Sequence, residues 1–135
     1  MNRIEILPNL WISTTASANN KDMNILTNIS ILINAEKELD FIYKQIYSNY
    51  DIIKINKYLI KITGYIHNQL KNNKAILIFC NNFKKTILII YAYLIKYGKI
   101  LKDNAINIIN SKYYDSENLY NTQNLLNELF DNNIL

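Results

Sequence analysis

Residues 75–95 read Ala-Ile-Leu-Ile-Phe-Cys-Asn-Asn-Phe-Lys-Lys-Thr-Ile-Leu-Ile-Ile-Tyr-Ala-Tyr-Leu-Ile. A short apolar run is broken at Cys80, the only cysteine of the chain, and a longer apolar run follows. The pattern predicts a buried strand over 75–79, a loop that Cys80 opens, and an apolar helix over 84–97 packed against a sheet. A thiol at the carboxyl end of a strand, just before a helix N-terminus, lies where backbone N–H groups gather anions. The segment therefore indicates a phosphate-binding loop with a potential nucleophile at its start.

This strand, loop and helix resemble the signature of the dual-specificity protein tyrosine phosphatases, which reads His-Cys-x-x-Gly-x-x-Arg-Ser. The family's His falls on Phe79, its Cys on Cys80, its Gly on Phe83, its Arg on Thr86 and its Ser on Ile87. Only the cysteine is retained. The segment is therefore similar to a degenerate member of that family.

The rest of the chain is similar to the same family along nearly its whole length. Residues 4–13 resemble the opening hairpin, 26–34 a helix end and the strand after it, 91–95 the helix after the loop, and 121–130 the last helix. The resemblance implies a single compact α/β domain over residues 1–135, with a central, mostly parallel sheet of about five strands flanked by helices.

Local patterns predict an order of elements that fits this fold. Short β-branched runs between turn-forming residues predict strands, and apolar positions at helical spacing predict helices. The predicted strands are 3–6, 10–13, 29–33, 51–55 and 75–79, and the predicted helices are 21–27, 38–47, 57–72, 84–97, 102–111 and 117–131.

The resemblance implies a cysteine thiolate that attacks phosphorus and an arginine whose planar fork binds two phosphoryl oxygens. Thr86 stands in the arginine position, and a hydroxyl cannot replace a bidentate cation, which costs about a thousandfold in rate. With Phe79 in place of the histidine as well, we expect Cys80 to be a mostly protonated thiol at neutral pH. Lys84 and Lys85 could restore some positive charge, but they lack the fork and are expected to point to solvent from the first turn of the helix.

Phe83 stands where the family has a glycine, a residue used where the backbone is strained or approaches a ligand. The favoured interpretation is that its ring covers or occupies the former phosphate site. In the alternative, the ring points outward and the loop amides still face an anion, with Asn81 and Asn82 as further donors; as simple turn formers these two are explained equally well. The degenerate phosphate loop comprises Cys80, Asn81, Asn82, Phe83, Lys84, Lys85 and Thr86.

The family's general acid is an aspartate on a loop that follows a strand of the type Ile-x-Ile-Pro. The corresponding strand here is 52–55, and it passes through Asn56 directly into the next helix, so the acid loop is predicted to be deleted. Asp51 precedes that strand, which predicts the wrong end of the sheet for a general acid.

The other polar candidates have simpler explanations. Glu36, Glu38 and Asp40 follow the third strand, where a solvated helix start accounts for them. His67, the only histidine, has no cysteine or carboxylate at ligand spacing, which indicates a surface or boundary residue. We therefore expect no metal site and no cofactor.

Composition indicates a single intracellular, cytoplasmic domain. The 135 residues are 50% hydrophobic, and one cysteine excludes an internal disulfide framework and a cysteine-based zinc cluster. The apolar runs are too short to span a membrane, and no signal peptide is expected. The net charge of +4 comes from dispersed lysines, which favours a solvated surface over nucleic-acid binding. Nearly half of the residues are Ile, Asn or Lys, which would suit an AT-rich genome such as that of a large virus, and then the host cytoplasm or the virion.

Three functional hypotheses follow, in this order. The first is a catalytically inactive pseudophosphatase that binds a protein, whether a phosphoprotein, an active phosphatase or a second copy of itself in a homodimer. The second is a module that reads phosphate through Asn82, Lys84 or Lys85. The third is a residual phosphatase that uses Cys80 with Lys84 or Lys85 as substitute cations.

Overall fold

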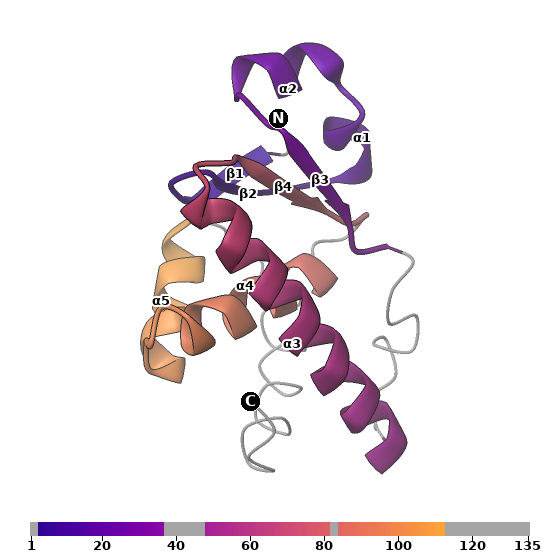
Figure 1. Cartoon of the computed structure of the whole chain (residues 1–135), viewed down its shortest axis with the longest axis vertical. Helices are drawn as coiled ribbons and strands as arrows, with labels where there is room; N and C mark the ends of the chain where they lie inside the picture. Colours follow the sequence, from indigo (N-terminus) through magenta and orange to yellow (C-terminus); the bar gives the residue numbers. More distant parts are fainter. Residues whose placement is uncertain (1–2, 37–47, 82–83, 113–135) are drawn as a thin grey trace.

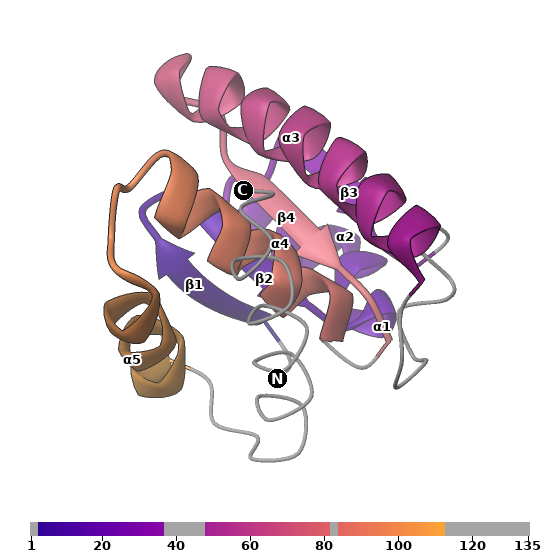
Figure 2. The same cartoon turned by 90° about the horizontal axis from the view of Figure 1, so that it is seen from below.

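The computed structural model describes residues 3–36, 48–81 and 84–112. Figure 1 shows its elements, and Figure 2 shows them from below. The described strands are β1 (Arg3–Leu7), β2 (Leu10–Ser13), β3 (Ile31–Asn34) and β4 (Ile76–Phe79). The described helices are α1 (Thr15–Ala18), α2 (Lys21–Leu26), α3 (Asn49–Lys71), α4 (Lys84–Lys96) and α5 (Lys102–Lys112).

The described strands form one mixed sheet in the order β1-β2-β4-β3. β1 and β2 are an antiparallel hairpin, and its turn places Asn9 at a φ of 69°, a left-handed conformation that asparagine tolerates. β4 runs parallel to both β2 and β3, and Phe79 pairs with Ser13 on one side and with Asn34 on the other. The carboxyl ends of three strands therefore meet at the same edge of the sheet.

Helices cover both faces of this sheet (Figures 1 and 2). Side chains alternate along β4: Ile76 and Ile78 belong to the main core with α3, α4 and α5, whereas Leu77 and Phe79 pack with Ala18 on the opposite face. All four residues of β4 are buried, as the continuous apolar run predicts for a central parallel strand. The predicted α/β domain is confirmed.

The apolar helix is confirmed as α4. Its side chains are buried without interruption from Lys85 to Leu94, so it packs on all sides. Helices predicted over 21–27 and 102–111 are confirmed as α2 and α5, within a residue or two at their ends. The helices predicted over 38–47 and 117–131 lie outside the described residues.

The strand predicted over 51–55 is wrong, because those residues are the first turns of α3. In a strand Ile53 and Ile55 would share one face, yet Ile53 is 53% exposed and Ile55 is 0% exposed. Ile55, Leu59 and Ile66 are all buried at helical spacing, so packing on α4 and the sheet extends the helix through a β-branched run. The described sheet accordingly has four strands, not five.

None of the helices in the described ranges is both long and apolar enough to cross a membrane. Even α3, the longest of them, carries lysines along its length.

Candidate functional site

Cys80 directly follows β4, as the sequence predicts. Its backbone N–H donates to the carbonyl of Ser13 at 3.2 Å, which continues the ladder between β4 and β2 by one residue. The Cys80 side chain is 0% exposed. The thiol is therefore held at the strand ends by the sheet itself and not by a loose loop.

Glu36 reaches the same place from β3. The N–H of Ala35 donates to the carbonyl of Phe79 at 2.9 Å, so the pairing with β4 continues past the end of β3. The N–H of Glu36 then donates to the side-chain oxygen Oδ1 of Asn34 at 2.8 Å. These bonds fix the turn after β3 and direct Glu36 toward Cys80.

One carboxylate oxygen of Glu36 serves two donors. Oε2 accepts from Sγ of Cys80 at 3.0 Å and from the backbone N–H of Asn81 at 2.7 Å. The Cys80 and Asn81 hydrogen bonds and the charge of Lys85 lower the pKa of Glu36, although partial burial opposes them. Glu36 is thus ionised at neutral pH. Glu36 is half-buried and bound to Cys80 and Asn81, so solvation alone does not account for it, and the same prediction for Glu38 and Asp40 lies outside the described residues.

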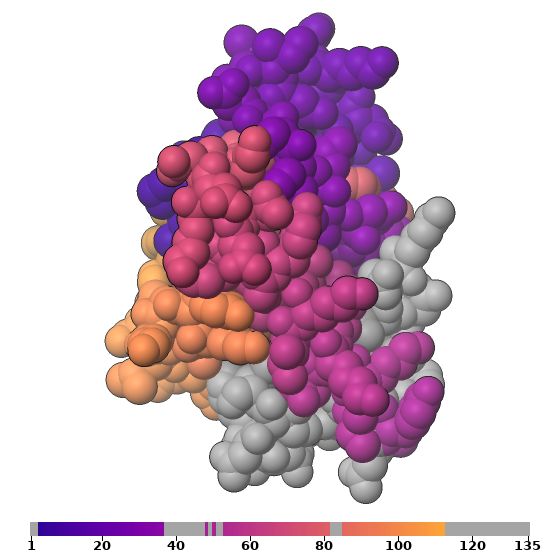
Figure 3. All heavy atoms as spheres, viewed as in Figure 1, coloured from indigo at the N-terminus to yellow at the C-terminus, as the bar shows by residue number. Residues whose placement is uncertain are grey.

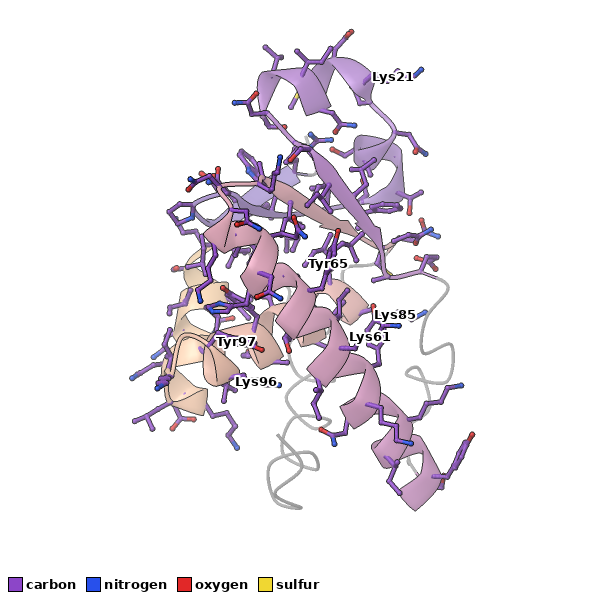
Figure 4. All side chains as sticks on the ribbon, in the orientation of Figure 1. Lys21, Lys61, Tyr65, Lys85, Lys96 and Tyr97 are labelled. Atoms are coloured by element: carbon purple, nitrogen blue, oxygen red, sulfur yellow. The ribbon has the colours of Figure 1, made fainter. Side chains whose placement is uncertain are left out.

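Lys85 also lies at this site, and the expectation that it points to solvent is wrong. Its side chain is only 3% exposed, and Nζ donates to the backbone carbonyl of Glu36 at 2.6 Å. The labelled Lys85 in Figure 4 extends from α4. As the second residue of α4, Lys85 thus points toward the turn after β3 rather than toward water.

Thr86, which the resemblance aligns with the arginine of the signature, is fully buried in the first turns of α4. Asn81 is exposed, but its amide is bound to Glu36. Asn82, Phe83 and the side chain of Lys84 lie outside the described residues, so both interpretations of Phe83 stay predictions.

Asp51 lies in the first turn of α3 and not before a strand. The prediction that Asp51 lies at the wrong end of the sheet relied on that strand and no longer has a basis. The prediction of a deleted acid loop relied on the same strand, so its alignment is wrong as well. Residues 37–47, which precede α3, and the side chain of Asp51 lie outside the described residues.

Glu36 is the residue of this site that sequence reasoning missed. A signal for it exists: an acidic residue stands two positions after a strand that parallels the cysteine strand. Parallel neighbours end at the same sheet edge, so such a residue is a candidate partner of the cysteine. This signal can be used only when the order of the strands in the sheet is known, and local sequence patterns do not determine that order.

Two other features lie apart from Cys80. A hollow of about 340 Å³ between β3 and α3 is lined by Ile33, Asn34, Tyr58, Lys61, Ile62 and Tyr65, and Figure 4 labels Lys61 and Tyr65. His67 is half-buried and stacks on the ring of Tyr97, with 4.2 Å between ring centroids. Across residues 3–36, 48–81 and 84–112, no three His, Cys, Asp or Glu side chains are grouped to hold a metal ion.

Comparison with solved structures identifies the architecture. The chain superposes on a leucine-rich repeat and phosphatase domain protein from Entamoeba histolytica with a TM-score of 0.71 and 18% identity, covering 98% of this chain and 95% of that one. It superposes on human DUSP28 with a TM-score of 0.70 and 10% identity, over 97% and 96% of the two chains. The fold is that of a dual-specificity phosphatase.

The same fold occurs in a human tyrosine phosphatase-like serine/threonine/tyrosine-interacting protein, with a TM-score of 0.64, 13% identity, and 91% and 94% coverage. No protein-family model matches the sequence, and no curated protein matches it at a significant level. The likeness is thus one of structure.

Proposed function

We propose that this chain is a catalytically inactive relative of the dual-specificity phosphatases that acts by binding another protein. The observation that carries the proposal is Thr86, a fully buried threonine at the signature position of the phosphate-binding arginine. Its hydroxyl can donate one hydrogen bond, whereas an arginine offers a charged, two-pronged contact to the phosphoryl group. Without that contact the charge that develops in the transition state loses its bidentate donor.

The surroundings of Cys80 support the same conclusion. A thiol nucleophile must ionise, and cysteine phosphatase chemistry needs positive charge or amide donors around the sulfur. A carboxylate oxygen of Glu36 lies 3.0 Å from Sγ. A hydrogen bond from sulfur to a carboxylate requires the protonated thiol, the unreactive form.

Lys85 does not take over the role of the arginine in this proposal. Its ammonium donates to the carbonyl of Glu36, on the β3 side of the site. A lysine also presents a point charge rather than a planar fork, so it cannot bind two phosphoryl oxygens in one geometry.

A binding function needs an accessible surface, and the described chain has one. The outer side of α3 exposes Tyr50, Ile53 and Ile60, and this helix crosses the face of the molecule seen in Figure 3. Ile53 and Ile60 are seven residues apart, which places them on the same side of the helix. Such exposed apolar side chains support contact with a protein, whether a phosphoprotein, an active phosphatase or a second copy of the chain.

The second candidate is a residual phosphatase that uses Cys80, with Lys84 or Lys85 as the substitute cation. The retained cysteine at the end of β4 favours it, because this is the nucleophile position of the fold. The two candidates differ in one property, turnover that depends on Cys80.

Hydrolysis of a small aryl phosphate and of a phosphotyrosine peptide tests the proposal. Wild type and Cys80→Ser are compared at high enzyme concentration from about pH 5 to 8, because acid–base catalysis depends on pH. We expect both proteins to match the uncatalysed background. Turnover that is present in wild type and lost in Cys80→Ser would contradict the proposal and favour the residual phosphatase. With no turnover in either protein, the same samples go to partner capture and to sedimentation for self-association.

A further inference from the structure

We propose that Glu36 is a built-in anion that occupies the start of the loop after β4, where it keeps Cys80 as a thiol and excludes phosphate. We call the group of Glu36, Cys80 and Asn81 the carboxylate lock. The inference rests on the proposed function, because it describes how the same site is kept unreactive. It goes beyond the missing arginine, which removes a favourable contact but places nothing in the site.

The lock is positioned by regular secondary structure. Asn34 and Phe79 are paired in the sheet, and the bond from the N–H of Ala35 to the carbonyl of Phe79 carries that pairing one residue further. Continued past the strand ends, this register sets Ala35 opposite Cys80 and Glu36 opposite Asn81. The pairing of β3 with β4 therefore brings the backbone of Glu36 beside the Cys80–Asn81 segment.

The backbone of Glu36 is held on both sides. Its N–H donates to Asn34 at 2.8 Å, and its carbonyl accepts from Nζ of the buried Lys85 at 2.6 Å. These bonds fix the backbone of Glu36, so only the side-chain torsions lose freedom when the carboxylate binds its donors. The backbone of Glu36 is thus pre-organised beside the cysteine.

The Asn81 amide is occupied by this contact. A backbone amide has one hydrogen, and that of Asn81 is directed at Oε2 of Glu36 at 2.7 Å. Asn81 is the first residue after Cys80, so its N–H is the first of the loop's backbone N–H groups that would face a phosphate. While Glu36 holds it, this donor is not available to an incoming anion.

The charge of Glu36 acts in the same direction. A carboxylate 3.0 Å from Sγ stabilises the S–H form by accepting its hydrogen and would repel a thiolate at that distance. It would repel a phosphate oxygen placed there as well. The same group therefore disfavours the nucleophile and the ligand together.

Thiol modification of Glu36→Gln tests the first half of the inference. Glutamine keeps the size and an acceptor oxygen but removes the charge. Because Cys80 is the only cysteine, the mass added by methyl methanethiosulfonate reports this thiol alone. The rate is measured against pH in wild type, in Glu36→Gln and in Glu5→Gln, which changes an exposed glutamate on β1.

We expect the pH of half-maximal rate to fall by about one unit in Glu36→Gln, with about tenfold faster modification at neutral pH, and no change in Glu5→Gln. The pH midpoint reports loss of the proton, whereas the plateau rate reports access to the buried sulfur. Coincident midpoints in wild type and Glu36→Gln would overturn the inference. If Glu36→Gln does not fold, Glu36→Asp withdraws the carboxylate by one methylene, and a midpoint equal to wild type there would overturn it too.

Titration with inorganic phosphate tests the second half. The Asn81 amide resonance is followed by nuclear magnetic resonance in ¹⁵N-labelled wild type and Glu36→Gln. We expect a saturable shift in the variant and none in wild type; equal phosphate affinity in the two proteins would overturn the exclusion of phosphate. These outcomes are separable from the proposed function, because Cys80-dependent hydrolysis by wild type would refute that proposal whatever Glu36→Gln does.

Discussion

Arg3, the only arginine of the sequence, shows how one residue's role is set by where it lies. It is 1% exposed on β1 and far in sequence from the loop after β4. Its Nε donates to Oγ of Ser17 at 3.2 Å, its Nη1 donates to Oγ1 of Thr27 at 2.9 Å, and its Nη2 donates to the carbonyl of Ser17. The one guanidinium of the chain therefore ties β1 to α1 and to the end of α2.

Arg3→Met is expected to destabilise the domain by about 2–4 kcal/mol, because it removes a buried charged donor and leaves half-buried acceptors on Ser17 and Thr27 without it. The free energy of unfolding from urea denaturation measures the effect. Arg3→Lys is the matched control: it keeps the charge but not the fork, and a loss of about half that size is expected. A change below about 0.5 kcal/mol in Arg3→Met would show that the bonds contribute nothing net.

At the scale of elements, α3 is where the observed structure differs from the sequence prediction. Sequence patterns divide it into a strand over 51–55 and a helix over 57–72, but it is one helix from Asn49 to Lys71. The run Ile52-Ile53-Lys54-Ile55 is rich in β-branched residues and has a high local propensity for a strand. In a helix, the stripe of Ile55, Leu59 and Ile66 is buried in the core. The free energy gained by burying these side chains outweighs the small preference of the run for a strand over a helix.

Two alanine substitutions distinguish a strand over 51–55 from a continuous helix. Ile55→Ala is expected to cost about 2–4 kcal/mol, because the side chain is fully buried, and Ile53→Ala less than about 1 kcal/mol. The two residues are two positions apart, so a half-buried strand would bury both or expose both. Similar losses in urea unfolding would therefore contradict the helix at this point.

At the scale of the whole molecule, the packing of α4 buries the phenol of Tyr91. Tyr91 is 0% exposed, and its hydroxyl has no hydrogen-bond partner within the described part of the chain. Burial raises the pKa of Tyr91 to about 12, from an ordinary value of 10.0. The folded protein therefore holds this proton more tightly than the unfolded chain does.

The sign of the resulting pH dependence follows from proton binding. Below pH 10 the phenol is neutral in both states, and between about pH 10 and 12 the unfolded state loses the proton first, so stability falls as pH rises. Tyr91→Phe should be neutral or slightly stabilising at pH 7, since it removes an unpaired hydroxyl. Its advantage over wild type should grow by about 1 kcal/mol at pH 11. Urea unfolding of both proteins at the two pH values measures this, and an unchanged difference would contradict the burial of the phenol.

The sequence by itself determined the features that neighbouring residues specify. The strands of the β1–β2 hairpin, the buried strand β4, Cys80 at its end and the apolar helix α4 could all be predicted, because short β-branched runs and the length of an uninterrupted apolar run can be recognised in neighbouring positions. The resemblance to the dual-specificity phosphatases added the overall fold, which the solved structures confirm.

Only the tertiary structure decided what surrounds Cys80. Glu36 meets Sγ across 44 positions of sequence, Lys85 is buried against the same turn, and residues 51–55 are helical because of the core they face. Each of these outcomes depends on which strand lies beside which and in what register. Local patterns fix the period of burial along one element, but the partner that it meets is set by the sheet order, to which residues distant in sequence contribute.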